Sequence, residues 1–367
     1  MIYYTIYLIL AVLILLTVGA KGKKQRYIEF IAVVIVVLFQ GLRWENGTDW
    51  DSYYNMFMYP ADPIYYNEYG WWLLNNIIQT NTGSYTVMLI VQCTIIVMLN
   101  IKFARHAGLN NVTSVIFGCF AGSIFPVRFA MASGIIMVGF RYIVERNFLK
   151  FLMYVVIAST IHIASILIIP FYFIPHKPLK LITMMLMYIG SIIIGFATAS
   201  VHSVLDSINS LLSIGAYAGD IQDKIDGYMS GGIGEYSIRS VKSIVLSFCS
   251  GAFFICLYYY FRKNYFNNTI SSNSYQNILY TVYLNLYVFG ICFNRAVAFT
   301  IPYLSRIGIL ASASAGLLLL LGLEKKFKRK SNLLFVYLIY IVYKFILFTQ
   351  TLHGQYESLF IPYNCVI

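Results

Sequence analysis

Ten apolar runs, each near the length needed to cross a bilayer, constrain the fold of this chain more than any other feature. About 20 helical residues span the hydrocarbon core. Of the 367 residues 59% are apolar and only 11% are charged, which leaves too little polar surface to cover a soluble globule. The sequence predicts an all-α polytopic membrane protein, one integral domain over 1–367, with about ten spanning helices at 2–19, 28–42, 84–101, 112–126, 129–144, 181–200, 241–261, 279–300, 304–323 and 333–349.

The distribution of charge predicts which loops face the cytoplasm. Ten of the 14 acidic residues lie in two stretches, 43–70 and 201–238. By contrast, 18 of the 26 Lys and Arg residues lie in six clusters, at 21–26, 102–105, 141–150, 177–180, 262–263 and 325–330. Because cytoplasmic loops carry the excess of Lys and Arg, we expect these clusters in the cytoplasm and the two larger loops, 43–83 and 201–238, in the periplasm. The apolar start has no basic region before it, so no cleavable signal peptide is expected.

One apolar segment, 151–174, does not fit this alternation of sides. Basic clusters precede and follow it, so a single crossing would place 325–330 outside. We therefore expect a membrane hairpin, with two limbs of about 12 residues that each reach about 18 Å into the bilayer and that turn near 160–162. Irregular backbone at this depth is tolerated where protein buries it or where it lines a wet cavity.

Composition also bounds the cofactors and partners. A net charge of +12 would suit nucleic acid, but the bases lie beside apolar runs, where they set membrane topology, and no nucleic-acid partner is expected. The six cysteines lie singly without a CxxC pair, which favours packing roles. The five histidines show no HxxxH spacing, so neither a metal nor another cofactor is expected.

The stretch 43–72 combines acids and aromatic rings to a degree that an ordinary connector does not need. It contains all four tryptophans and five of the 14 acids. Trp44 and Trp50 suit stacking on a sugar, whereas Trp71 and Trp72 suit an interfacial aromatic belt. We interpret the stretch as the floor of a substrate site that also includes Glu68.

Asp49 is the first candidate for a catalytic base. It follows a Gly-Thr pair that can form a tight turn, and it stands between the rings of Trp50 and Tyr53. A carboxylate enclosed by rings has a raised pKa and can take a proton from a sugar hydroxyl. The alternative is a helix N-cap at or near this position.

Four arginines at the expected outer ends of membrane segments predict an anion site. A guanidinium at this depth is costly without an anion, and its planar fork binds phosphate oxygens bidentately. The alternative for each is that it snorkels to lipid headgroups or pairs with a loop acid. Together they predict a pocket for a lipid-linked pyrophosphate, formed by Arg43, Arg128, Arg295 and Arg306.

His162 is the second candidate for the base. It lies at the tip of the expected hairpin. A lone His in an apolar helix is commonly a core residue bonded to a neighbour such as Ser159 or Ser165, and that alternative remains open here.

At these residues the chain resembles the EpsG-type family of exopolysaccharide and O-antigen (Wzy-type) polymerases. It departs from the family pattern at Phe129, where a glutamine is common, and at Tyr69, where a proline is common. The resemblance rests on Arg43 followed by GTDWDSYY at 47–54, Glu68 with Gly70, RFAMA at 128–132, IHIAS at 161–165 and SRIG at 305–308.

The resemblance implies a multi-pass enzyme of the bacterial inner membrane with its active site facing the periplasm. Such enzymes join undecaprenyl pyrophosphate-linked oligosaccharide repeat units without a metal. Expected partners are the lipid-linked glycan donor and acceptor, membrane lipid, a chain-length regulator and a flippase. The alternative function is a flippase or another polysaccharide transporter, whose charges would line a path across the membrane rather than gather on the outer side.

Overall fold

The computed structural model describes residues 1–47, 49–60, 68–122, 124–125, 128–199, 241–266, 275–298, 302–354 and 357–366. Across these ranges the chain is helical, and the sole β pairing there is an isolated bridge between Arg43 and Cys365. The predicted all-α fold is therefore confirmed. The predicted periplasmic loop 201–238 lies outside the described residues.

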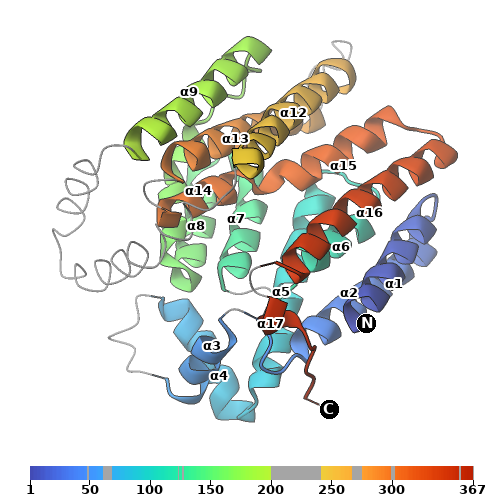
Figure 1. The fold of residues 1–367 in the computed structure, drawn as a ribbon, viewed down its shortest axis with the longest axis vertical. Helices are drawn as coiled ribbons and strands as arrows, with labels where there is room; N and C mark the ends of the chain where they lie inside the picture. The colour runs from blue at the N-terminus through green and yellow to red at the C-terminus, as the bar shows by residue number, and fades with distance from the viewer. Residues whose placement is uncertain are drawn as a thin grey trace. The chain divides into compact units, whose positions relative to one another are not determined.

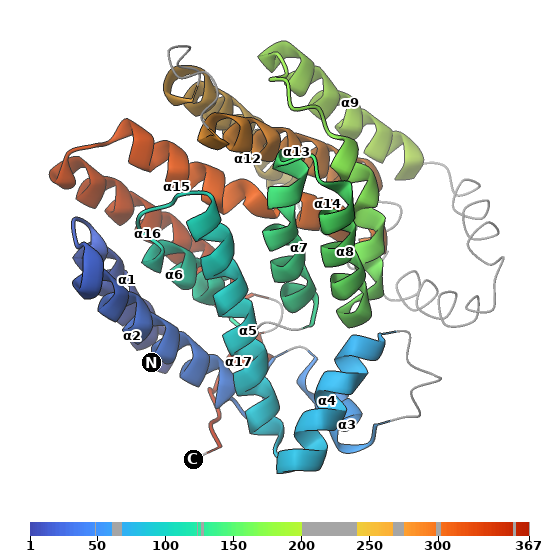
Figure 2. The same cartoon turned by 180° about the vertical axis from the view of Figure 1, so that it is seen from behind.

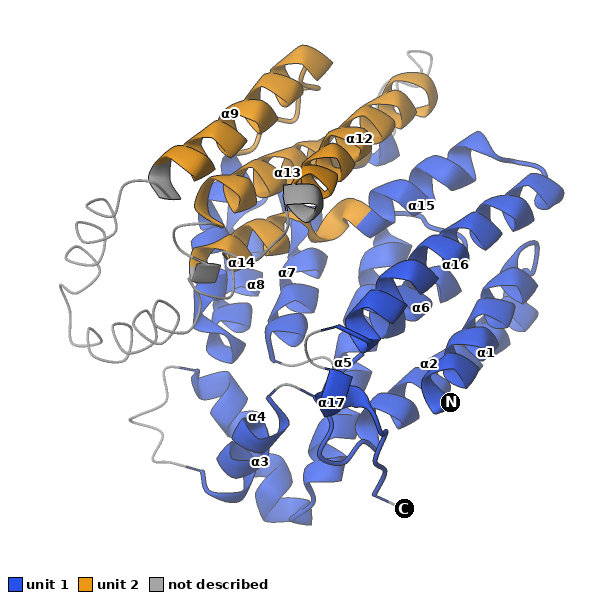
Figure 3. Cartoon of the chain, viewed as in Figure 1, with its two compact units in different colours: residues 1–173, 273–279, 316–367 blue, residues 174–272, 280–315 orange. Residues whose placement is uncertain are grey.

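The chain divides into two compact units (Figure 3). Unit 1 comprises 1–173, 273–279 and 316–367, and unit 2 comprises 174–272 and 280–315. Each unit combines segments from different parts of the chain, and this division does not test the expectation of one integral domain, which stays a prediction.

Unit 1 is built around α5, which packs against α2, α6 and α7. In both views α3, α4 and the C-terminus lie at the same end of this unit (Figures 1 and 2). Its helices are α1 (Ile2–Thr17), α2 (Gly22–Gly41), α3 (Trp50–Met58), α4 (Tyr69–Thr82), α5 (Tyr85–His106), α6 (Thr113–Gly122), α7 (Arg128–Val144), α8 (Phe148–Ile161), the 3-10 helix η2 (Ile163–Phe173), most of α15 (Ala315–Lys326), α16 (Lys330–Leu352) and α17 (Glu357–Phe360).

In unit 2 the helix that contains Gly290 packs closely against the helix that contains Gly308. A Cβ added to Gly308 would lie 2.6 Å from the carbonyl oxygen of Gly290, so the two backbones touch where neither residue has a side chain. The Asn294 amide also donates to the Ser305 carbonyl at 3.0 Å. The glycine of the SRIG motif is therefore a packing residue. The helices of unit 2 are α9 (Leu181–Ala199), α12 (Val241–Tyr265), most of α13 (Tyr275–Val297), α14 (Pro302–Ala311) and the 3-10 helix η4 (Ser312–Ser314).

A helix coincides with each of the ten predicted runs. Within the described residues, four helical stretches are long and apolar enough to cross a membrane, namely Tyr85–His106, Val245–Tyr265, Leu304–Lys326 and Lys330–Leu352. Several other apolar helices are shorter, α1 and α6 among them. The membrane character is thus supported, and the count of ten crossings stays a prediction.

The predicted reversal of the chain within 151–174 is present. Helix α8 ends at His162, whose backbone is extended, with φ −150° and ψ 106°. The chain then returns along α8, because the ring of Tyr172 lies 5.0 Å from that of Phe148 and 5.6 Å from that of Phe151. The second limb is the 3-10 helix η2 rather than an α-helix, and it contains Pro170, which cannot donate a helical hydrogen bond.

Two acids join helices at the end of unit 1 that lies away from α3 and α4. Glu29 of α2 accepts from Arg105 of α5 at 2.7 Å. Glu324 of α15 accepts from the backbone N–H groups of Asn110 and Asn111 at 2.9 and 2.8 Å, and from the Tyr337 hydroxyl at 3.0 Å. Since charges in an apolar bundle need partners, these acids serve the fold.

The hairpin makes a topological prediction. In a chain whose six native cysteines are replaced, Lys150→Cys and Phe173→Cys should react with a membrane-impermeant thiol reagent from the same side, because the two limbs start and end together. Asn81→Cys, at the far end of α4, should react from the other side. Labelling of the 150 and 173 thiols from opposite sides would show that this segment crosses the membrane.

Candidate active site

The candidate site is centred on Glu68, which immediately precedes α4. The start of α4 reaches the end of α8 because position 70 is a glycine. A Cβ there would lie 2.3 Å from the Thr160 hydroxyl oxygen and 3.1 Å from the Thr160 carbonyl oxygen. This contact places the Glu68 side chain at the break between α8 and η2, where His162 lies.

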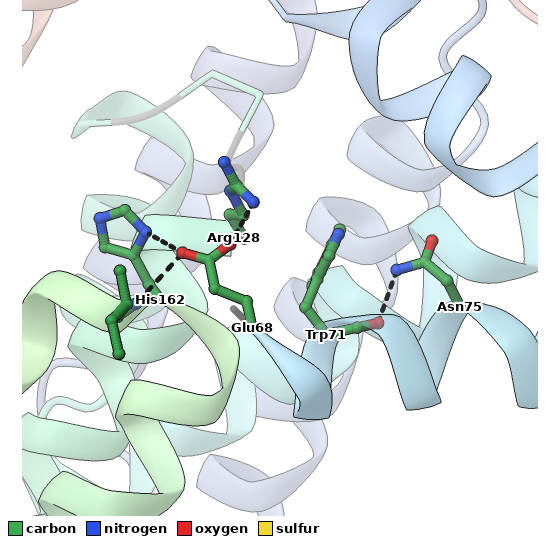
Figure 4. Close-up of polar contacts among 6 residues, drawn as sticks. Glu68, Trp71, Asn75, Arg128 and His162 are labelled. Carbon is green, nitrogen blue, oxygen red and sulfur yellow. Dashed lines mark hydrogen bonds and ion pairs between the residues drawn. The ribbon is translucent and has the colours of Figure 1, made fainter. Parts of the chain in front are cut away.

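Glu68 joins three segments that are remote in sequence (Figure 4). Its Oε1 atom accepts from His162 Nδ1 at 3.1 Å and from the backbone N–H of Ile163 at 3.1 Å. Its Oε2 atom accepts from Arg128 Nη1. Glu68 is 7% exposed and His162 is 5% exposed, so these contacts form away from bulk water.

The contacts keep Glu68 ionised. Burial by itself would raise the pKa of Glu68, but the hydrogen bond from His162 and the charge of Arg128 outweigh burial and lower the pKa below its ordinary value of 4.5. An ionised carboxylate only accepts hydrogen bonds, so His162 carries a hydrogen on Nδ1.

The other ring nitrogen of His162 is in a different environment. Nε2 is buried and has no hydrogen-bond partner among the described residues. The ring is held on its side by Phe129, 5.5 Å away at 84°. A neutral His with hydrogen on Nδ1 has a lone pair on Nε2 that can accept a proton, and the neighbouring carboxylate would stabilise the imidazolium formed.

Arg43 differs from Arg128 because no acid among the described residues pairs with it. Its side chain lies over the Phe125 ring at 4.8 Å, and it is 3% exposed. Nε and Nη1 have no hydrogen-bond partner among the described residues. The ionisable side chains around it are those of Tyr3, Tyr85, Cys93 and Tyr363. A buried cation without an anion is costly, so this position is suited to an anionic ligand.

Aromatic rings also pack around Arg128. Arg128 lies over Tyr53 at 5.5 Å, and Tyr53 contacts the Trp71 ring at 5.8 Å. Trp71 is buried at 3% exposure, so the expectation that it belongs to an interfacial belt is wrong.

Trp50 and Trp44 form a second part of this aromatic wall. Trp50 stacks on Tyr54 at 4.8 Å and meets Tyr85 edge-on at 5.6 Å. Trp44 packs edge-on against Trp50 at 5.0 Å and remains half-buried. Because Trp50 is 6% exposed, its ring serves packing in this conformation, and a stacking role toward sugar stays a prediction for both residues.

The structure corrects the expected surroundings of Asp49. It directly precedes α3 as the N-cap residue, but its side chain makes no cap hydrogen bond and is exposed. The expectation that rings enclose this carboxylate is therefore wrong. Its backbone carbonyl accepts from Tyr53 N at 3.1 Å, which starts the helix. A role for Asp49 as a base stays a prediction.

Arg295 and Arg306 belong to unit 2, whereas Arg43 and Arg128 belong to unit 1. Arg295 donates to the Ser247 hydroxyl at 2.7 Å and lies over the Phe248 ring at 5.3 Å. Arg306 lies half-buried on α14. A single pocket formed by all four arginines therefore stays a prediction.

Three residues of this region escaped the sequence analysis: Asn46, Phe125 and Tyr363. The Arg43 guanidinium lies over the Phe125 ring, and Tyr363 is close to Arg43. Asn46 is 2% exposed and bonds to a segment more than 300 positions away, with a separation of 318 to Asn364. The Asn-Gly pair at 46–47 signals a turn, but nothing local in the sequence signals its distant partner.

These features define a class: an all-helical membrane protein whose larger unit contains a buried cluster of an acid, a histidine and an arginine, and a second buried arginine. The chain belongs to the EpsG family, whose family model matches residues 26–365, nearly the whole chain. Membership in this family indicates a polysaccharide polymerase role. No curated protein and no solved structure matches the chain.

The close contact at Gly70 predicts a local packing defect. Gly70→Ala should destabilise the protein by about 1–3 kcal/mol, because the added methyl group pushes α4 away from Thr160. Gly122→Ala is the matched control, since a Cβ at Gly122 meets nothing within 4 Å. Thermal unfolding of the purified proteins in detergent measures both. Equal melting temperatures for the two variants would contradict the packing argument.

The lowered pKa of Glu68 predicts a stability difference that depends on pH. Because the folded pKa lies below the ordinary 4.5, the pairing of Glu68 stabilises the protein above pH 4.5 and is lost as pH falls through the folded value. Glu68→Gln should therefore unfold at a lower temperature than wild type at neutral pH. The two melting curves should converge in acid. A constant gap from pH 7 to pH 3 would show that folding does not lower the pKa of Glu68.

Proposed function

We propose that this protein polymerises undecaprenyl pyrophosphate-linked oligosaccharide repeat units at the periplasmic face of the bacterial inner membrane. The observation that carries the proposal is the Glu68–His162 contact, in which Glu68 also pairs with Arg128 and the Nε2 atom of the buried histidine has no partner among the described residues. Family membership supports the polymerase class. The carrier lipid, the periplasmic orientation and independence from metals are part of the proposal.

The proposed reaction is one glycosyl transfer. The terminal hydroxyl of one lipid-linked glycan attacks the anomeric carbon of another, a new C–O bond forms, and the bond from that carbon to the pyrophosphate oxygen breaks. The electron pair leaves with the pyrophosphate. His162 Nε2 takes the proton of the attacking hydroxyl, and Glu68 stabilises the resulting imidazolium.

The arginines have different tasks in this proposal. Arg43 is buried, and its Nε and Nη1 atoms have no hydrogen-bond partner among the described residues, so they can bind the pyrophosphate as negative charge develops on it. Arg128 donates to Glu68, and its guanidinium lies over the Tyr53 ring, so its task is to hold Glu68 in place. Binding of the pyrophosphate by Arg295 and Arg306 stays a prediction.

A transporter is the competing function. A flippase would need charged groups along a path between the two sides of the membrane. In unit 1 the acids at the opposite end, Glu29 and Glu324, are bound to structural partners. At the other end, buried Glu68 contacts His162, whose second ring nitrogen has no partner among the described residues. This distribution favours an enzyme.

The deciding experiment replaces the proposed base with glutamine, a polar side chain that can still form hydrogen bonds but cannot act as a base. His162→Gln should lower polymer formation by about 10² to 10⁴, the scale of a lost general base, while single lipid-linked units accumulate in the periplasm. Asp49→Asn should change the rate much less, because that side chain is exposed and outside the cluster. His106→Gln, at the other end of α5, is the control for replacement of a histidine.

Two outcomes would reject parts of this proposal. Accumulation of the units in the cytoplasm would identify a flippase. Near-normal polymer from His162→Gln together with strong loss from Asp49→Asn would move the base to Asp49. Membrane levels and melting temperatures of each variant show whether a loss reflects chemistry or folding.

A further inference from the structure

A short segment far from Arg43 in sequence closes onto the loop that carries it. This closing segment, 357–366, contains α17 and an extended stretch. The closing segment and this loop form backbone hydrogen bonds at three places: Gly47 N to Leu359 O at 2.9 Å, Trp44 N to Asn364 O at 3.0 Å, and Val366 N to Leu42 O at 3.2 Å. The isolated bridge between Arg43 and Cys365 lies in the middle of this pairing.

Asn46 fastens the pairing with its side chain. Its amide nitrogen donates to Pro362 O at 2.9 Å, and its amide oxygen accepts from Asn364 N at 2.7 Å. Loop residues 42–47 form no helix or strand of their own. Because buried backbone groups need partners, the loop depends on the closing segment for its conformation.

The closing segment also supplies the rings behind Arg43. Phe360 stacks on Phe125 at 5.8 Å and 21°, and Phe125 is the ring over which the Arg43 guanidinium lies. Tyr363 stacks on Phe39 at 4.7 Å and 13°, and its hydroxyl donates to Phe39 O at 2.7 Å. The guanidinium thus lies on a wall of rings that the closing segment backs.

We infer that the closing segment is a fixed part of the anion site, and that Asn46 is a positioning residue that keeps Arg43 buried and unpaired for its ligand. This inference rests on the proposed function for the identity of that ligand, a prenyl-linked pyrophosphate. A guanidinium released from this wall would be solvated and would pair with water or with nearby acids. It would then hold a pyrophosphate less tightly and in no fixed position.

The first measurement concerns the pocket alone. In detergent, phenylglyoxal should modify Arg43 slowly in the wild-type protein, as read by mass spectrometry of the peptide that contains it. Asn46→Ala should raise this rate about tenfold or more, because lost buried hydrogen bonds favour local opening. Phe360→Leu should raise this rate as well, and this variant provides the test if Asn46→Ala does not fold. Asn81→Ala is the matched control, since that exposed amide bonds only within α4, to Ile77 O at 2.6 Å.

The second measurement connects the pocket to its ligand. Farnesyl pyrophosphate should raise the melting temperature of wild type and of Asn81→Ala, and this rise should be lost in Arg43→Gln and largely lost in Asn46→Ala. If Asn46→Ala and Phe360→Leu both fold and phenylglyoxal still modifies Arg43 as slowly as in wild type, the inference is overturned. Faster modification with full stabilisation by farnesyl pyrophosphate would also overturn it. If Arg43→Gln keeps the stabilisation, the pyrophosphate site of the proposed function fails instead, while the modification rates still decide whether the closing segment holds Arg43.

Discussion

A carboxylate buried in an apolar helical bundle can persist only if other groups replace its water, and Glu68 meets this condition with contacts from two other segments. Arg128 supplies the opposite charge, while His162 and the Ile163 N–H supply hydrogen bonds. These contacts require α4, α7 and the break after α8 to converge on one point. The break at His162 is therefore also what gives Glu68 its partners, since a continuous α-helix would keep the Ile163 N–H for itself.

The two arginines of unit 1 show two solutions to the same cost of burial. Arg128 is neutralised within the protein, whereas Arg43 rests on a ring and leaves two nitrogens unbonded among the described residues. An unpaired guanidinium stores free energy that an arriving anion can recover. A paired one mainly fixes geometry. In this arrangement Arg128 pairs with the acid that contacts the histidine, whereas Arg43 pairs with no acid among the described residues.

The sequence was sufficient for features that depend on composition and on local pattern. Apolar runs predicted the helices, and the basic clusters on both sides of 151–174 predicted its reversal, because both follow from the cost of polar groups in hydrocarbon. The sequence also selected Glu68, Arg128 and His162 individually. It could not show that the three touch, since their positions depend on helix packing at Gly70. It likewise placed Asp49 between Trp50 and Tyr53, but these rings pack on Tyr54 and Trp71 instead, because neighbours in sequence on a helix point to different sides.

The pairing of 42–47 with 357–366 has a consequence for the order of biosynthesis. Asn46 and Asn364 are 318 positions apart, so nearly the whole chain is made and inserted between the two halves of this contact. Until residues 357–366 have been synthesised, the loop that carries Arg43 lacks the partner for its backbone hydrogen bonds. The Glu68–His162–Arg128 cluster, by contrast, contains no residue beyond Ile163 and can assemble much earlier in synthesis, which proceeds at roughly 5–20 residues per second. The two parts of unit 1 therefore form at different stages of biosynthesis, the cluster first and the environment of Arg43 last.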